Sequence, residues 1–417
     1  MPTLETNRAI DAVWRIEAAR LIAGLTRMVH DVGLAEELAQ DALVAALEQW
    51  PESGVPDNPG AWLMAIAKRR AIDMFRRRET LDRKVTEIGR DMETQELPTA
   101  EPDFDAIHSN ISDDLLRLVF ISCHPVLSTE ARVALTLRLL GGLTTEEIAR
   151  AFLTPEPTIA QRIVRAKKTL AQKKVPFEVP AASELEERLA SVLEVVYLVF
   201  NEGYAATGGE DWMRPALCED AMRLGRILAE LVPKEPEAHG LIALMEIQAS
   251  RARARTAPDG TPVLLLDQDR SRWDQLLIRR GLAALDRAAA IGEPMGPYVL
   301  QAEIAACHAR ARTPEETDWP RIAALYARLV QLVPSPVIEL NRAVALSMAF
   351  GPEAGLGIVD ELTEIPSMQN YHLLPSVRGD LLAKLGRQEE ARAEFERAAS
   401  LTRNEREREL LLKRAAE

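Results

Sequence analysis

Cysteine, histidine and aromatic residues are all scarce in this sequence of 417 residues. The three cysteines, Cys123, Cys218 and Cys307, lie far apart without CxxC spacing, so the sequence suggests neither a disulfide framework nor a zinc site. Such cysteine usage is typical of a reducing cytoplasm, and we expect a cytoplasmic protein. The six histidines are scattered and supply no recognisable catalytic or metal-binding arrangement, so no cofactor is expected.

Long apolar runs and phosphate-binding glycine loops are also lacking. No stretch reaches the ~18 consecutive apolar residues that span a bilayer. The first twenty residues contain acidic side chains and no apolar core, so we expect no signal peptide. The sequence GGLTTEE at residues 141–147 has no P-loop lysine. Without a catalytic motif, the sequence predicts a protein that is not an enzyme.

Helix-forming residues dominate what is present, and their apolar positions recur at steps of three and four. The chain is too long for a single core. Two proline-containing breaks divide it. Small and large positions of a 34-residue helical repeat are matched by Gly379, Ala391, Phe395 and Ala398, and the second half of such a unit is echoed by Ile322, Tyr326, Leu329 and Pro334. The sequence therefore predicts an all-α fold with a helical domain at 8–80, an acidic linker at 81–111, a second helical domain at 112–176 and a tetratricopeptide-like extension at 184–417.

Residues 144–170 have the pattern of a helix-turn-helix. Either Thr144 or Thr145 is the expected N-cap of the first helix, with Glu147 near a capping-box position. After the TPEP turn, the second helix has an apolar stripe from Ile159 to Leu170. Its other face carries donors and cations suited to base edges and phosphates in a major groove: Thr158, Gln161, Arg162, Arg165 and Lys168. A helical hairpin with a solvated basic face would show the same spacing.

A second basic stretch, AWLMAIAKRRAIDMFRRR at residues 61–78, is unexpected in a chain with a net charge of −13. As a helix it turns Leu63, Ala67 and Ala71 inward. Its outer side combines cations with Trp62. Cations neutralise phosphates and an aromatic ring stacks on a base, so this face suits an unpaired or melting strand. A buried Trp62 beside a solvated arginine run is equally compatible with the spacing.

Together these segments resemble the sigma-70 family, and within it the extracytoplasmic-function (ECF) class of subunits that direct bacterial RNA polymerase to promoters. Residues 31–50, DVGLAEELAQDALVAALEQW, resemble conserved regions 2.1–2.2, and residues 57–78 resemble regions 2.3–2.4. Residues 128–170 resemble region 4. The tail, with FNEGYAAT and GPYVLQAEIAACHA, resembles the subgroup that has a tetratricopeptide-like C-terminal extension. The resemblance covers essentially the whole chain.

The resemblance implies binding to core RNA polymerase and promoter DNA, with no catalytic residues. The implied polymerase-binding face, whose acidity would complement a basic partner, consists of Glu36, Glu37, Gln40, Asp41 and Glu48. The residues implied for the −10 element are Trp62, Lys68, Arg69, Arg70, Asp73, Arg76 and Arg77. Those implied for the −35 element are the polar face of the second helix of the helix-turn-helix.

The resemblance also implies that the linker threads towards the active-site and RNA-exit path of the polymerase, and that the tail is regulatory. Helical-repeat arrays form concave surfaces that bind peptides or proteins, so we expect a regulatory partner there. One alternative is a one-component helix-turn-helix regulator with a sensing tail, which leaves the first basic stretch unexplained and predicts a dimer. Another is a pure scaffold, which leaves the N-terminal half without a purpose.

Overall fold

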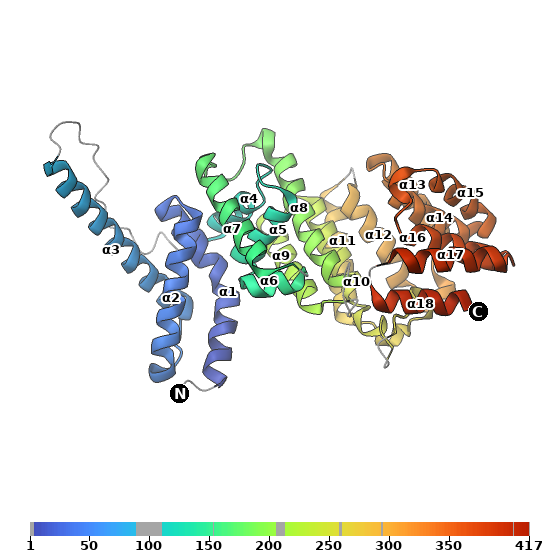
Figure 1. Ribbon diagram of the computed structural model, residues 1–417, viewed down its shortest axis with the longest axis horizontal. Coiled ribbons are helices and arrows are strands. Elements are labelled where there is room, and N and C mark those ends of the chain that lie inside the picture. Colours follow the sequence, from blue (N-terminus) through green and yellow to red (C-terminus); the bar gives the residue numbers. More distant parts are fainter. Residues whose placement is uncertain are drawn as a thin grey trace. The chain divides into compact units, whose positions relative to one another are not determined.

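The computed structural model describes residues 4–88, 111–152, 154–205, 213–257, 261–292, 295–402 and 404–416. Helices dominate these ranges, and their only β-pairing is an isolated bridge between Thr256 and Pro262 (Figure 1). The all-α prediction is confirmed. No helix within these ranges has both the length and the apolar character needed to cross a membrane. The chain forms two compact units, Met1–Val195 and Val196–Glu417.

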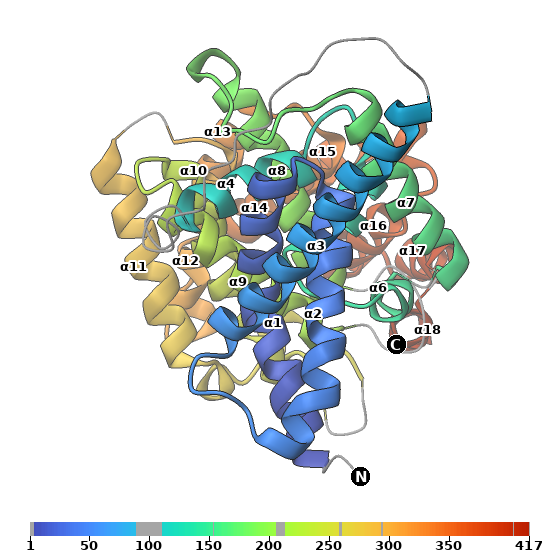
Figure 2. The ribbon, with the colours of Figure 1, turned by 90° about the vertical axis from the view of Figure 1, so that its left-hand side faces the viewer.

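The first unit begins with a three-helix module, which Figure 2 shows side by side: α1 (Leu4–Val29), α2 (Val32–Ser53) and α3 (Pro59–Ile88). Asp31 caps α2 by accepting a hydrogen bond from the backbone N–H of Leu34 at 2.9 Å. Leu63 and Ala67 of α3 are buried against the other two helices, as the spacing predicts. The last turns of α3 extend into the expected linker, and the rest of that linker, residues 89–110, lies outside the described residues.

A helix-turn-helix module follows, made of α4 (Ile111–Ser122), α5 (Thr129–Leu139), α6 (Thr145–Ala151) and α7 (Glu156–Gln172). Ser128 caps α5, accepting a hydrogen bond from the N–H of Ala131. The turn between α5 and α6 needs both of its glycines. A Cβ on Gly141 would lie 2.4 Å from the Leu137 carbonyl oxygen, and Gly142 has a φ of +70°.

The division between the two units falls within α8 (Ala182–Tyr204). Its first half packs on the helix-turn-helix module through polar anchors. Arg188 donates to the Phe120 carbonyl at 2.9 Å, and Ser191 donates to the Cys123 carbonyl at 2.7 Å. Arg132 of α5 donates to Ser191 and pairs with Glu194 at 3.1 Å. The start of α8 thus completes the first unit, while the domain boundaries given above remain predictions.

The second unit is a succession of helices in which each packs on the next. Several begin with proline at the first helical position, where its missing N–H is not needed. Short 3₁₀ turns connect some of them. The helices are α9 (Pro215–Leu231), α10 (Pro236–Ala249), α11 (Gln275–Ile291), α12 (Pro297–Arg310), α13 (Trp319–Leu332), α14 (Pro336–Phe350), α15 (Pro352–Thr363), α16 (Leu373–Lys384), α17 (Gln388–Leu401) and α18 (Glu405–Ala416).

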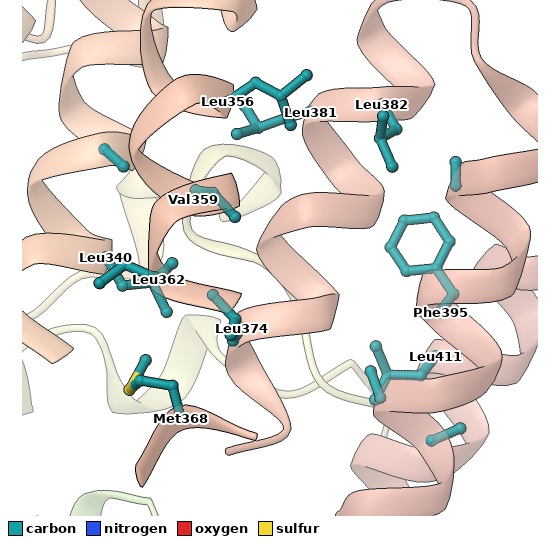
Figure 3. Packing of buried hydrophobic residues seen from close by; sticks show 14 of the residues in the cluster. Leu340, Leu356, Val359, Leu362, Met368, Leu374, Leu381, Leu382, Phe395 and Leu411 are labelled. Carbon is teal, nitrogen blue, oxygen red and sulfur yellow. The ribbon is translucent and has the colours of Figure 1, made fainter. Parts of the chain in front are cut away.

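The core of α14–α18 is apolar and closely packed. Figure 3 shows Leu356, Leu381 and Phe395 directed between neighbouring helices. A Cβ added to Gly379 would lie 2.9 Å from the Phe395 ring, so the small residue lets α16 approach α17. Nearest-neighbour packing of this kind is typical of helical-repeat arrays. The likeness to the tetratricopeptide repeat itself remains a prediction.

Candidate nucleic-acid interface

The first helix of the helix-turn-helix is held by a reciprocal capping box. Thr144 Oγ1 accepts from the N–H of Glu147 at 3.1 Å, and Glu147 Oε2 accepts from the N–H of Thr144 at 2.8 Å. The sequence prediction of this cap is confirmed. The cap fixes where α6 begins, and α6 packs on α7. Glu147 also pairs with Arg15 of α1 at 2.8 Å, so one carboxylate joins the cap to the three-helix module.

The second helix, α7, has the two faces that the sequence predicts. Its apolar stripe is buried, from Ile159 (1% exposed) to Leu170 (3%). The candidate DNA-contacting residues all lie on the other face: Thr158, Gln161, Arg165 and Lys168 are exposed, and Arg162 is half-buried. A groove of about 450 Å³ runs between this face and the start of α5, where Ser128 and Glu130 line it. The arrangement offers hydrogen-bond donors and cations together on one helix.

The basic stretch on α3 is only partly exposed. Arg69, Asp73 and Arg76 are exposed, whereas Trp62, Lys68 and Arg70 are half-buried. Burial, followed by the positive charge of Arg27, lowers the pKa of Lys68. Arg70 pairs with Asp41 of α2 at 3.2 Å. The side chain of Arg77 lies outside the described residues, so α3 brings together six of the seven candidate residues on described side chains.

The aromatic residues of α3 differ in exposure. Trp62 contacts the buried ring of Trp50 edge-to-face, with centroids 5.2 Å apart. Phe75 and Ile72, by contrast, are 41% and 42% exposed. Sequence reasoning missed Phe75, although its place within DMFRRR puts an aromatic ring directly beside three cations. Phe75 is therefore the more accessible stacking surface of this helix.

The candidate polymerase-binding residues of α2 differ in how exposed their side chains are. Glu37, Asp41 and Glu48 are exposed and Gln40 is half-buried. The apolar residues Val44 (48% exposed) and Leu47 (43%) lie among them and were not anticipated. An exposed apolar strip with an acidic rim is suited to a protein partner that carries basic residues.

Glu36 differs from the other four candidates on α2, because its side chain is only 3% exposed. Arg138 Nε of α5 donates to Glu36 Oε1 at 2.6 Å, and Gln40 Nε2 donates to the same oxygen at 2.6 Å. Lys167 of α7 forms an ion pair with Glu36 Oε2. The helix-turn-helix module therefore surrounds this carboxylate with two cations.

Two further contacts join the modules. Asp114 of α4, which is 3% exposed, pairs with Arg27 of α1 at 3.2 Å and with Arg117 at 2.8 Å. Burial raises the pKa of Asp114, against the opposing effect of both arginines. The Gly142 turn also rests on α1, where a Cβ would lie 3.8 Å from the Ala18 methyl carbon. Charged groups thus take part in the contact between the two modules.

The second unit contains a separate polar groove of about 430 Å³ between α9, α10 and α11. Glu246 (2% exposed) lines it and pairs with Arg226 at 2.8 Å and Arg280 at 3.3 Å. Arg287 and the buried His239 also line it, and Nδ1 of His239 finds no hydrogen-bond partner among the described residues. Across the described ranges, no group of three or more His, Cys, Asp or Glu side chains is placed to hold a metal ion.

Three family models match separate segments of the chain. The family model Sigma-70 region 2 matches residues 15–80, Sigma-70, region 4 matches residues 117–170, and a family of unknown function matches residues 188–289. An uncharacterized protein of Rhizobium meliloti is 45% identical over 385 residues, which is 92% of this chain and 89% of that protein.

Two relatives with assigned names match a part of the chain. The probable ECF RNA polymerase sigma factor SigI of Mycobacterium tuberculosis is 26% identical over 180 residues, 42% of this chain and 58% of that protein. The ECF RNA polymerase sigma factor SigK of a Mycobacterium species is 27% identical over 161 residues, 37% of this chain and 77% of that protein. The similarity to each of these two proteins covers less than half of the chain.

Proposed function

We propose that this chain, which belongs to the sigma-70 family and to its ECF class, binds core RNA polymerase and starts transcription at promoters with particular −10 and −35 elements. It is a sigma factor with an additional helical C-terminal part. The observation that carries the proposal is α7, whose polar face is exposed while its apolar face is buried in a capped helix-turn-helix. The role is non-enzymatic and belongs in the cytoplasm, where polymerase and promoter DNA meet.

The −35 element would be read by α7 in the major groove. Gln161 and Arg165 have side chains of the kind that form bidentate hydrogen bonds to adenine and guanine, respectively. Thr158 and Lys168 would add contacts to bases or phosphates along the same face, and Arg162 would contribute from its edge. The N-terminus of α5, which lines the adjoining groove, would face the neighbouring phosphates.

The −10 element would meet α3. Arg69 and Arg76 would neutralise phosphates, with Lys68, Arg70 and Arg77 nearby. Trp62 and Asp73 belong to the same proposed surface. Phe75 would stack on an unpaired base, because its ring is more exposed than that of Trp62.

Core polymerase would bind the face of α2. Glu37, Asp41 and Glu48 would meet a basic surface, and Val44 and Leu47 would be buried between them. Burial of the two apolar side chains would favour binding, while the acidic rim would set its orientation. Gln40 and Glu36 lie at the border of this face.

The C-terminal helices would regulate this activity by binding a protein or peptide. The groove between α9 and α11 supports this proposal. Arg226 and Arg280 share the buried carboxylate of Glu246. A guanidinium group has five N–H donors, so the arginines that line the groove suit a partner with acidic side chains. Arg287→Ala should then alter transcription without altering DNA contact by α7, as measured by comparing promoter output with binding of the −35 fragment.

In vitro transcription tests the proposed function directly. Purified protein and sigma-free core polymerase are incubated with fragmented genomic DNA of the source organism, and the transcript starts are mapped. We expect discrete starts that share upstream −35 and −10 elements. Arg165→Ala should lower use of the −35 element by about 1–3 kcal/mol if it contacts a base edge. Arg392→Ala, an exposed change in the second unit, is the matched control.

A separate binding assay tests the polymerase face. Asp41→Arg should abolish copurification with core polymerase and leave the helical content unchanged, because the Asp41–Arg70 pair is exposed and contributes little to stability. Normal copurification of this variant would contradict the assignment of α2. Failure of the unaltered protein to bind core polymerase would instead favour the one-component regulator.

A further inference from the structure

The loop between α10 and α11, residues 250–274, is rich in arginine. It carries Arg251, Arg253, Arg255, Arg270 and Arg272. Among the residues that the structure describes, the four loop arginines other than Arg255 form no ion pair. Glu315 attracts Arg270 and Asp269 attracts Arg272, both from beyond ion-pair distance. The loop therefore holds more positive charge than the described carboxylates neutralise by direct contact.

Two of these arginines lie beside one indole ring. The guanidinium carbon of Arg270 is 4.9 Å from the ring centroid of Trp273, and that of Arg251 is 6.0 Å from it. Trp273 is only 4% exposed. Its Nε1–H is buried, as are the Nε–H groups of Arg251 and Arg270, and none of the three has a hydrogen-bond acceptor among the described residues. Buried donors without an acceptor are costly, so this cluster suits a ligand that supplies acceptor oxygens.

Hydrogen bonds to the backbone hold the arginines in place. Nη1 of Arg270 donates to the carbonyl oxygens of His308 at 2.8 Å and Ala311 at 2.7 Å, at the end of α12. Its Nη2 donates to Thr317 Oγ1 at 3.1 Å. Arg255 stacks on the ring of Tyr204, 3.6 Å from its centroid, and donates to the carbonyl of the same residue. The loop is thus fixed against α8 and α12, and its cations cannot simply turn into solvent.

The positive charge of the loop also acts on a neighbouring imidazole. Burial, followed by the charges of Arg251 and Arg270, lowers the pKa of His308 to about 3. An environment that disfavours a further proton so strongly favours a negative charge for the same reason. His308 is therefore neutral in the folded protein, and the two arginines are the cations of this cluster.

A groove of about 640 Å³ adjoins the cluster, and Trp273 forms part of its wall. Arg253 and Arg272 line the groove and are exposed, so they can reach a ligand from solvent. The groove also includes Asp274, whose Oδ1 accepts from the N–H groups of Leu276 and Leu277 at the start of α11. This carboxylate is engaged as a helix cap. The volume is typical of sites for small molecules.

We propose that this groove binds a small ligand through a phosphate group, either free phosphate or a phosphorylated small molecule. Arg253 and Arg272 would contact the phosphate directly, since guanidinium groups bind phosphate oxygens in pairs. Trp273 Nε1–H would donate to a further oxygen, and the charges of Arg251 and Arg270 would attract the anion from beside the indole. The ligand would tie the loop to α11 and so stabilise the second unit. The site lies outside the DNA-contacting and polymerase-binding surfaces, so the proposal does not depend on them.

Thermal unfolding of the full chain tests the binding. Inorganic phosphate is added at fixed ionic strength, with chloride as the balancing anion, and the unfolding midpoint should rise saturably by about 3 °C or more. Arg253→Gln combined with Arg272→Gln should weaken phosphate binding about tenfold or more. Arg279→Gln, an exposed change on α11 outside the groove, is the matched control and should keep the full rise. Phosphate also stabilises proteins in general, and the comparison between these variants removes that contribution.

The indole of Trp273 provides a local readout. In the full chain with ¹⁵N-labelled tryptophan, its Nε1–H resonance is identified by its loss in Trp273→Phe. This resonance should shift saturably with inorganic phosphate, because a new acceptor approaches the N–H. The indole resonances of Trp50 and Trp62, which belong to the first unit, should not shift.

Two further probes distinguish the sources of the phosphate group. Tighter binding of glucose 6-phosphate or adenosine monophosphate than of inorganic phosphate would support a phosphorylated small molecule, and equal binding would support free phosphate. The proposal is overturned if phosphate and chloride give the same midpoint. It is also overturned if the double arginine variant responds to phosphate as strongly as Arg279→Gln does. Loss of sigma activity in the unaltered chain would leave both measurements valid, so the two proposals can fail separately.

Discussion

The contact between the three-helix module and the helix-turn-helix module differs in kind from the contacts between neighbouring helices of the second unit. The first contact includes buried carboxylates, Glu36 and Asp114, each neutralised by cations. The helices α14–α18 share an apolar core of Leu, Met, Val and Phe side chains around small residues, and their ion pairs, such as Arg378–Asp360, involve carboxylates that are more exposed than Glu36 and Asp114. Hydration of charges that separate is favourable and offsets part of the lost attraction, whereas exposure of apolar surface to water is unfavourable. The two contacts should therefore respond to different substitutions, the first to loss of a charge and the second to loss of apolar volume.

The largest effect is expected where the apolar packing is removed. Phe395→Ala takes a buried ring away from Gly379 and should lower the free energy of unfolding by about 3–5 kcal/mol. Denaturant unfolding, followed by hydrogen exchange in α16–α18, would measure it. Arg392→Ala on the same helix should change stability by less than about 0.5 kcal/mol. If Phe395→Ala and Arg392→Ala lowered the free energy of unfolding equally, apolar packing would not be the main source of stability in α14–α18.

A truncation tests where the first unit ends. A chain of residues 1–176 lacks α8 and loses the hydrogen bonds from Arg188 and Ser191 and the partners of Arg132. At ~0.5–1.5 kcal/mol for each bond, it should be about 2–4 kcal/mol less stable than residues 1–205. Thermal unfolding of the two fragments would show the difference. Identical midpoints would mean that α8 belongs only to the second unit.

Glycine substitutions probe the close approach of helices. A Cβ on Gly240 of α10 would lie 2.6 Å from the backbone nitrogen of Val299, so Gly240→Ala should destabilise the second unit by about 1–3 kcal/mol. Among the described residues, no neighbouring side chain or other segment comes within 4 Å of a Cβ placed on Gly357 of α15, so Gly357→Ala should stabilise the second unit by about 0.5–1 kcal/mol. Urea unfolding of both variants checks the opposite signs. If Gly240→Ala left the free energy of unfolding unchanged, α12 would be able to move away from α10 at little cost.

The last comparison is a pH dependence of opposite sign in the two regions. Burial, with the charges of Arg251 and Arg270, lowers the pKa of His308 to about 3. Below about pH 6.5, His308 therefore binds a proton in the unfolded chain but stays neutral in the folded chain. The stability of α12 should fall as the pH drops below about 6.5, by at most about 1.4 kcal/mol per pH unit. The effect should disappear in His308→Gln.

Asp114 should behave in the other direction. Its pKa is raised in the folded protein, so the folded state keeps a proton that the unfolded state has lost. The contact of α1 with α4 should therefore weaken as the pH rises from the ordinary value of 3.8 through the raised pKa. Hydrogen exchange between pH 4 and 7, corrected for intrinsic rates, would measure how the protection of α1 and of α12 changes with pH. If the protection of α1 and that of α12 changed in the same direction with pH, the pKa directions given for Asp114 and His308 would be contradicted.

Local features of the fold could be predicted from the sequence because their partners are close in the chain. The Thr144–Glu147 cap and the stripe that starts at Ile159 are examples. The environment of Glu36 could not be predicted, since Arg138 lies 102 residues away. A signal did exist, because Val32, Glu36 and Ala39 share one helical face and the other two are apolar. No spacing within α2, however, reveals which cations a distant module supplies.

The edge-to-face contact of Trp50 with Trp62 gives the molecule an optical reporter of its own. Two indoles this close couple their electronic transitions, and the coupling depends steeply on their separation and angle. Trp62 belongs to the helix proposed to meet the melting strand, whereas Trp50 is fixed in the interior of its neighbour. Any movement of α3 against α2 would therefore change the near-ultraviolet circular dichroism, without an added dye.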